Sequence, residues 1–296
     1  MIIDYDIHQL TPYINWDYFL YAWGMHNKPA DERQKLQQEA EQVLADLEGR
    51  YRAHALFLLV DAHSEGDDIV LSDGHRIPLL RQQQPGSECL CLADFIQPLT
   101  PHPSPLASHL SPLTSRIGLF ATTVDMGLEK DFDHDAYQKM MVQLLADRLA
   151  EAAAECMHEV VRKYYWGYAP DEQLTMQQLH SEQFQGIRPA VGYPSLPDTS
   201  LNFVLNELLD FHQIGIRLTE SGAMRPHASV SGLMMAHPQA RYFAVGTIGN
   251  DQLKDYARRR GLPVEVMRKF LSSNLSPLTP HRSPLPSHFS PLTSKK

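Results

Sequence analysis

Residues 186–194 read GIRPAVGYP, and this short stretch is more informative than any other part of the sequence. Pro189 restricts the preceding Arg188 to extended backbone geometry. Gly192 permits a positive φ or a close backbone approach, and Tyr193 adds an aromatic ring. We therefore expect a rigid, irregular loop that presents one guanidinium beside open backbone. The planar fork of arginine suits a carboxylate or phosphate; the alternative is an arginine that caps the C-terminus of a helix.

The composition of the 296 residues excludes several classes of protein. The 26 basic and 35 acidic residues give a net charge of −9, which argues against nucleic-acid binding. No apolar run approaches the roughly 18 residues of a transmembrane helix, and the N-terminus lacks the pattern of a secretory signal. Three cysteines indicate a reducing compartment without a disulfide framework. We expect a soluble cytoplasmic protein with neither a nucleic acid nor a membrane as partner.

Hydrophobic periodicity predicts helices and strands that do not alternate regularly along the chain. Helices are expected at 33–50, 134–165, 174–183, 200–212, 250–259 and 263–272. Strands are expected at 54–60, 69–71, 116–124, 228–236 and 241–248, with the first two joined as a hairpin. This order of elements favours the α+β class over a doubly wound parallel sheet.

Two proline-rich segments, 98–115 and 277–294, are almost identical copies of each other. Both are rich in proline, serine and threonine, so they should form loops or remain disordered. A ligand for a partner's groove is one interpretation, and repetitive sequence tolerated at the surface is the favoured one. We therefore expect one domain over residues 1–272 with an insertion at 98–115, and a disordered tail at 273–296.

Several common catalytic and metal-binding motifs are absent. There is no glycine-rich phosphate loop, and no His or Cys pair has zinc-finger spacing. Cys89 and Cys91 are best interpreted as small buried residues, so no metal site is expected. Asp147, Glu151 and Glu155 form an acidic row at i, i+4 and i+8 of a predicted helix, for which a solvated face is the simpler explanation.

GIRPAVGYP closely resembles the RxxxGY loop that binds S-adenosylmethionine (AdoMet) in the activation domain of cobalamin-dependent methionine synthase. Further motifs resemble the same family and occur in its order, over roughly residues 13–272. They are YINW (13–16), CLADF (91–95), DRLAEA (147–152), VRKYYWGYAP (161–170), LTES (218–221), ASVSG (228–232), HPQARYFAV (237–245) and DQLKDYARRRGL (251–262). The resemblance implies a C-shaped, single α+β domain with a twisted antiparallel sheet flanked by helices.

The function implied by the resemblance is reductive reactivation of cobalamin. In the family, oxidation of cob(I)alamin leaves inactive cob(II)alamin on methionine synthase. The activation domain brings AdoMet to the cobalt, and flavodoxin or an equivalent reductase supplies one electron. The methyl group of AdoMet then traps the reduced cobalt as methylcobalamin. The two cofactors carry most of this chemistry, while the protein supplies position and electrostatics.

The resemblance assigns five site residues to the RxxxGY loop and the long helix. Arg188 matches the arginine that holds the AdoMet carboxylate. Ala190 and Gly192 match positions whose backbone approaches the ligand, and Tyr193 matches the loop tyrosine. Glu151 matches a helix glutamate close to the site, which favours a ligand role for it over a solvated one.

Three further site residues are assigned with departures from the family pattern. Tyr242 and Phe243 fall on a Tyr-Tyr pair near the ligand, and Phe243 lacks the second hydroxyl. Asn15 stands where the family usually has an aspartate that pairs with the AdoMet α-ammonium. Val191 replaces the usual proline of the loop, which should leave the loop slightly less rigid.

The sequence begins a dozen residues before the first family motif, which leaves no room for the homocysteine, folate and cobalamin modules that the family carries upstream. We therefore expect an activation subunit, without complete catalytic machinery, that works in trans on a methionine synthase or another corrinoid protein. The alternative is an AdoMet-binding sensor that has lost reactivation activity. An independent methyltransferase is disfavoured because the glycine-rich strand–loop–helix of the common methyltransferases is absent.

Asn15 generates the first prediction, which concerns AdoMet affinity. Asparagine accepts a hydrogen bond but carries no charge, so AdoMet binding should be weaker by about 1–2 kcal/mol, or about tenfold, than with aspartate. We expect Asn15→Asp to tighten binding by that factor in a calorimetric titration. Unchanged affinity in the variant would refute this account of position 15.

Overall fold

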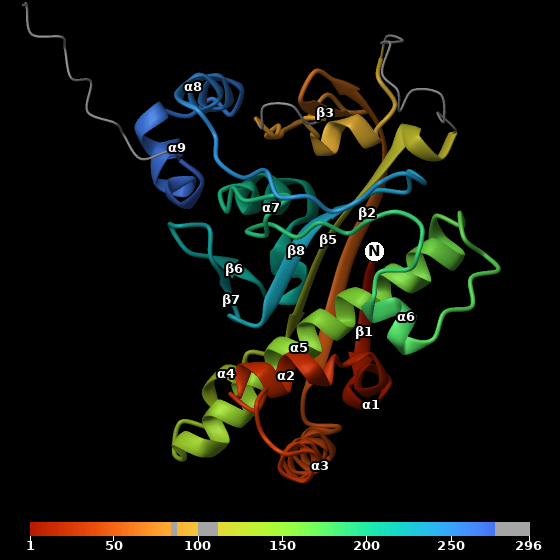
Figure 1. Ribbon diagram of the computed structural model, residues 1–296, viewed down its shortest axis with the longest axis vertical. Helices are drawn as coiled ribbons and strands as arrows, with labels where there is room; N and C mark the ends of the chain where they lie inside the picture. Colours follow the sequence, from red (N-terminus) through yellow and green to blue (C-terminus); the bar gives the residue numbers. More distant parts are fainter. Residues whose placement is uncertain (84–87, 100–111, 276–296) are drawn as a thin grey trace, which may run out of the picture.

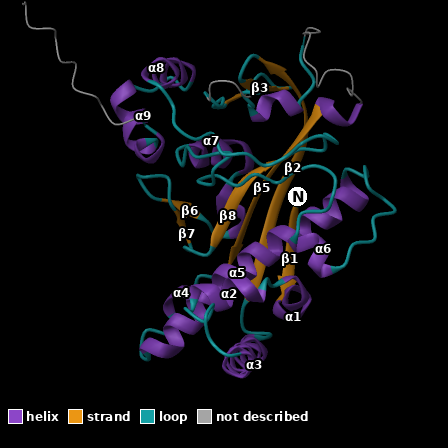
Figure 2. Ribbon diagram, viewed as in Figure 1, coloured by secondary structure: helices purple, strands orange, loops and turns teal. Residues whose placement is uncertain are grey.

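A curled antiparallel sheet forms the centre of the computed structural model, which describes residues 1–83, 88–99 and 112–275 (Figure 1). The strand order is β4-β3-β2-β5-β8, and β1 pairs with β2 at the other end of that long strand. Helices lie on both sides of the sheet (Figure 2). The bounds are β1 Ile2–Asp6, β2 Arg52–Glu65, β3 Asp68–Leu71, β4 Arg76–Pro78, β5 Arg116–Val124 and β8 Ser229–Met234. The predicted α+β class is confirmed.

The 14-residue strand β2 connects the two halves of the sheet. Along Arg52–Leu56 it pairs with β1, and along Ala62–Glu65 it pairs with β3. The opposite edge of β2 pairs with β5 over nine residues of each strand. The predicted hairpin and the predicted strand at 116–124 are therefore confirmed.

The long helix α5 (Ala136–Val160) covers one face of the sheet (Figure 1). Asp135 caps its N-terminus, because the carboxylate accepts hydrogen bonds from the backbone N–H groups of Tyr137 and Gln138. A π-helical turn, Val161–Tyr165, continues it to the end of the predicted helix at 134–165. In the described part of the chain no helix, α5 included, combines the length and apolar character needed to cross a bilayer.

The sheet separates two hydrophobic cores. Phe120 of β5 packs in the core beneath α5, whereas its neighbours Leu119 and Ala121 pack in the core on the opposite face. This alternation is the period of two that a strand imposes on its side chains. A third, smaller core lies between α8 and α9. The remaining elements are α1 Ile7–Leu10, α2 Trp16–Ala22, α3 Ala30–Leu47, α4 Gly127–Lys130, α6 Met176–His180, α7 Leu201–Leu209, β6 Arg217–Leu218, β7 Met224–Arg225, α8 Asn250–Arg259 and α9 Val264–Phe270.

The strand predicted at 241–248 is wrong. This segment is irregular and joins no ladder, although the backbone N–H of Val245 donates to the carbonyl of Pro194 at 2.9 Å. Its apolar residues do reach the interior: Val245 and Ile248 are buried in the core between α8 and α9. The segment lies along an irregular loop rather than a strand, so it has no regular partner with which to form a ladder.

Most of the two proline-rich copies lies outside the described residues. Positions 100–111 of the insertion and 276–296 of the tail are not described. The described end of the insertion, Pro112–Ser115, forms a 3₁₀ turn, where only loop was expected. At the other end, Ser272–Asn274 forms a 3₁₀ turn, and the carbonyl of Asn274 accepts a hydrogen bond from Ile248 at 2.8 Å. Short turns of this kind tolerate sequences that exclude a longer helix.

Gly232 of β8 generates a prediction about stability. A Cβ at this position would lie 2.2 Å from the carbonyl oxygen of Pro189 and 2.9 Å from the Cα of Ala190. Gly232→Ala should therefore lower the free energy of unfolding by about 3 kcal/mol in urea titrations, because backbone atoms must move. The control Gly261→Ala meets no atom within 4 Å and should cost about 1 kcal/mol from its positive φ alone. Equal losses in the two variants would contradict the prediction.

Candidate functional site

The GIRPAVGYP loop is attached to the outer edge of β8 by backbone hydrogen bonds. Ile187 and Met235 exchange two hydrogen bonds of 3.0 Å each, and the N–H of Leu233 donates to the carbonyl of Pro189 at 3.0 Å. The missing side chain of Gly232 makes this close approach possible. These bonds hold the irregular loop, which was expected from the sequence, along the sheet edge, which was not.

Arg188 points from this loop toward α5 and does not cap a helix. Its Nη2 lies 2.9 Å from Oε2 of Glu155, and the two side chains are only 11% and 12% exposed. The guanidinium also lies above the ring of Phe120, 5.9 Å from the centroid. The backbone N–H of Arg188 donates to the hydroxyl oxygen of Tyr242 at 2.9 Å. Two predicted site residues, far apart in sequence, are thus in direct contact.

Tyr193 connects the same loop to Glu151 of α5. Its hydroxyl donates to Oε1 of Glu151 at 2.9 Å. The negative charge of Glu151, together with burial, raises the pKa of Tyr193 to about 12. The phenol is therefore a stable hydrogen-bond donor at neutral pH, while 53% of the residue remains exposed.

Two adjoining cavities, of about 350 and 370 Å³, lie between the loop, α2 and α5. They have four lining residues in common, Glu151, Glu182, Arg188 and Tyr193. Asn15 lines the first cavity, while Ala190, Tyr242 and Phe243 line the second. We refer to the pair as the loop cavity. Of the eight predicted site residues, Gly192 alone does not line it; with a φ of +89° it shapes the loop behind Tyr193.

Asn15 has a structural role in addition to its place in the cavity. Its side chain accepts a hydrogen bond of 3.4 Å from the backbone N–H of Tyr18 and so caps the N-terminus of α2. Aspartate is an equally good N-cap residue. An exchange to aspartate should therefore change the charge of the cavity without removing the cap.

Two acidic residues of the site were missed in the sequence. The solvated-face interpretation of the acidic row is wrong for Glu155, which lines the loop cavity and pairs with Arg188. Glu182 also lines it, in a left-handed backbone conformation with a φ of +55°. Burial raises the pKa of Glu182 above its usual range. Spacing alone does not distinguish such carboxylates from exposed ones, because burial comes from elements distant in sequence.

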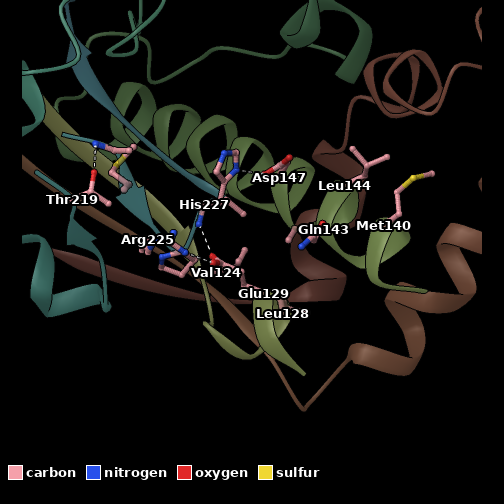
Figure 3. A pocket seen from close by; sticks show the side chains of 15 residues that line it. Val124, Leu128, Glu129, Met140, Gln143, Leu144, Asp147, Thr219, Arg225 and His227 are labelled. Carbon is pink, nitrogen blue, oxygen red and sulfur yellow. Dashed lines mark hydrogen bonds and ion pairs between the residues drawn. The ribbon is translucent and has the colours of Figure 1, made fainter. Parts of the chain in front are cut away.

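A second cavity, of about 460 Å³, lies one turn nearer the N-terminus of α5 (Figure 3). Apolar side chains such as Val124 and Leu144 line much of it, and no residue of the predicted site takes part. At its rim, Glu129 accepts hydrogen bonds from Nη1 of Arg225 and from the backbone N–H of His227, at 3.1 and 2.7 Å. Nothing in the sequence had indicated this cavity.

One group of possible metal ligands occurs among the described residues, at Asp6, His8 and Glu48. Their carboxylate and imidazole groups already have protein partners. His8 binds Glu48 through both its backbone N–H and its ring, and Asp6 pairs with Arg52 at 3.0 Å. These contacts explain the group without a metal: they connect the C-terminal end of β1 to the C-terminal end of α3 and to β2.

A buried network supports the segment that carries Glu182. Arg162 is fully buried, binds both oxygens of Glu172, and lies 4.2 Å from the ring centroid of Phe184. Its Nη1 is 2.9 Å from Nδ1 of His158, which is also fully buried. The network fixes the chain between Glu172 and Phe184 to the C-terminal end of α5, and thereby positions Glu182 at the cavity.

Comparisons with known proteins find similar sequences and a similar fold. The family model described as vitamin B12 dependent methionine synthase, activation domain, matches residues 6–261. A solved structure described as the MetH reactivation domain bound to AdoHcy is 37% identical in sequence, with a TM-score of 0.81. That match covers 93% of this chain and 90% of the other.

His158 generates a prediction about the pH dependence of stability. Burial, with the nearby charges of Arg162 and Arg188, holds the pKa of His158 well below its usual 6.5. Below pH 6.5 the unfolded chain therefore binds a proton that the folded chain does not, and stability falls as the pH drops. The slope from this group is at most about 1.4 kcal/mol per pH unit.

We expect His158→Gln to remove that slope between pH 6.5 and 5 in urea titrations. The exposed His134 provides the matched control, since His134→Gln should keep the full pH dependence. A slope that survives in the His158 variant would show that other groups are responsible.

Proposed function

This chain belongs to the activation-domain family of vitamin B12-dependent methionine synthase, and on that premise we propose that it binds AdoMet in the loop cavity. We further propose that it supports reductive methylation of cob(II)alamin on a methionine synthase or a related corrinoid protein. The observation that carries the proposal is the buried, cavity-lining Arg188, in a chain 37% identical to a reactivation domain bound to AdoHcy.

The chemistry of the cavity suits the amino-acid end of AdoMet. A guanidinium is the preferred partner of a carboxylate because it offers two parallel N–H donors. Nε of Arg188 is buried and has no hydrogen-bond partner within the described residues. A ligand carboxylate would satisfy it. The loop backbone at Ala190 and the rings of Tyr242 and Phe243 line the other end, where an adenosine group has an aromatic surface on which to pack.

The charge of the cavity also suits AdoMet. Its described lining contains three glutamates, at 151, 155 and 182, against the two arginines 148 and 188. AdoMet carries two positive groups, the α-ammonium and the sulfonium, and one carboxylate. An acidic excess in a partly buried site favours such a net cation, since electrostatic attraction is stronger away from water.

The corrinoid and the electron donor are proposed to be supplied by partners. Two strings match the DxHxxG spacing, DAHSEG (61–66) and DFHQIG (210–215). The first lies in the β2–β3 hairpin and the second in a short 3₁₀ turn, and neither histidine lines the loop cavity. We therefore propose that the cobalamin is presented by a partner. AdoMet would supply the methyl group, and flavodoxin or an equivalent reductase the electron. What this chain contributes is the position of the sulfonium ligand, held by Arg188, Tyr193 and the loop backbone.

The alternative function is an AdoMet sensor without reactivation activity, for which the uncharged Asn15 is the supporting observation. An assay in trans separates the two functions. The chain, AdoMet and reduced flavodoxin would be added to cob(II)alamin bound to a methionine synthase that lacks its own activation domain. Methylcobalamin formation, followed by absorbance, supports the activation function. AdoMet binding without methylation of the partner supports the sensor.

Removal of the Arg188 side chain should greatly weaken AdoMet binding. We expect Arg188→Ala to reduce affinity at least 100-fold in calorimetric titrations, because a charged, buried hydrogen-bond donor is lost. Arg188→Lys should lose at least tenfold, since an ammonium cannot make the two-pronged contact. Arg241→Ala, which removes an exposed arginine paired with Glu88, is the control and should bind normally. Wild-type affinity in Arg188→Ala, or no binding by the wild type at millimolar AdoMet, would overturn the proposal.

A further inference from the structure

The ion pair between Glu155 and Arg188 leaves one polar atom of each partner unused. Nη2 of Arg188 contacts Oε2 of Glu155. Nε of Arg188 and Oε1 of Glu155 are both buried and have no hydrogen-bond partner among the described residues. An unpaired charged atom in the interior is unfavourable. Arg188 can therefore bind one further anionic group through Nε, and Glu155 can bind one further cationic group through Oε1.

The amino-acid end of AdoMet supplies that missing pair of charges. Its α-carboxylate and α-ammonium are attached to one carbon, so they reach two opposite charges that lie side by side. Glu155 and Arg188 line the same cavity as Asn15, at which the family resemblance places the ammonium.

We propose that Glu155 accepts a hydrogen bond from the α-ammonium of AdoMet and supplies there the negative charge that Asn15 lacks. Arg188 holds the neighbouring α-carboxylate. This inference rests on the proposed AdoMet binding. It assigns a ligand role to Glu155, which the sequence pattern alone had placed on a solvated face.

The other acidic residues near the site are less suited to this role. Glu151 already accepts the hydroxyl of Tyr193. Glu182 lines the loop cavity, but among the described residues it has no ion pair of 4.0 Å or less with Arg188. Asp147 lines the other cavity, shown in Figure 3, where it faces His227 at 3.9 Å. Glu155 is the carboxylate that combines a charged partner with an unused oxygen at the loop cavity.

Three ligands and two variants test the proposal by calorimetric titration. The ligands are AdoMet, decarboxylated AdoMet, which keeps the amine, and methylthioadenosine, which has neither amine nor carboxylate. Glu155→Gln should bind AdoMet and decarboxylated AdoMet 10- to 100-fold more weakly than the wild type, and methylthioadenosine within about twofold. The control Glu265→Gln, which removes an exposed charge on α9 paired with Arg268, should bind all three normally.

The ligand set separates direct contact from mere support of Arg188. If Glu155 only orients Arg188, the variant loses affinity for AdoMet but not for decarboxylated AdoMet, and the proposal is overturned. Equal AdoMet binding by Glu155→Gln and wild type also overturns it. Because Glu155→Gln leaves the guanidinium buried without a counter-charge, Glu155→Asp provides a second variant that keeps the charge. It should recover part of the lost affinity for both amine-bearing ligands.

Failure of the proposed function gives a different result. If the wild type binds none of the three ligands, AdoMet binding itself is refuted, and the role of Glu155 with it. If the wild type binds all three and Glu155→Gln matches it throughout, AdoMet binding stands and only the assignment of Glu155 fails. Circular dichroism and urea midpoints of each variant confirm that the proteins compared are folded.

Discussion

The backbone pairing of the GIRPAVGYP loop with β8 is the contact on which the site depends. A loop normally gains its shape from solvent-exposed turns, but here a β8 residue without a side chain, Gly232, lets the loop backbone lie directly against the sheet. The pairing fixes where Arg188 leaves the loop, and so directs its side chain across Phe120 to α5. One glycine in the sheet thereby determines where the guanidinium meets the carboxylates of the helix.

Helix α5 lines both the loop cavity and the more apolar cavity of Figure 3. The acidic residues of its row are evenly spaced, but each lies in a different environment. Asp147 lies at the more apolar cavity, where burial raises its pKa. Glu151, one turn on, accepts a hydrogen bond from the loop tyrosine. Glu155, a further turn on, is almost enclosed and paired with Arg188. Successive turns of a straight helix present the same face to different partners, because the loop and the β6–β7 region approach that face at different heights.

The sequence predicted those features that depend on local pattern. Periodicity was sufficient for α5 and β5, and the family resemblance brought together residues as distant as Asn15, Arg188 and Tyr242. Two failures have a common cause. The apolar run at 241–248 lacks a regular strand as its neighbour, and Glu155 is buried by a loop more than thirty residues away. Both outcomes are decided by tertiary partners, which periodicity does not encode.

The charges of the loop cavity with and without the ligand explain why position 15 holds a neutral asparagine. The cavity holds three glutamates, of which Arg188 neutralises one through a direct ion pair. A fourth carboxylate would repel the others whenever the ligand is absent, and burial would increase that repulsion. Asparagine keeps the N-cap of α2 without this penalty. If Glu155 provides one negative charge for the ligand ammonium, an aspartate at position 15 would add a second and tighten binding, but only at the cost of this repulsion in the ligand-free protein. The two residues are therefore best understood as one electrostatic unit.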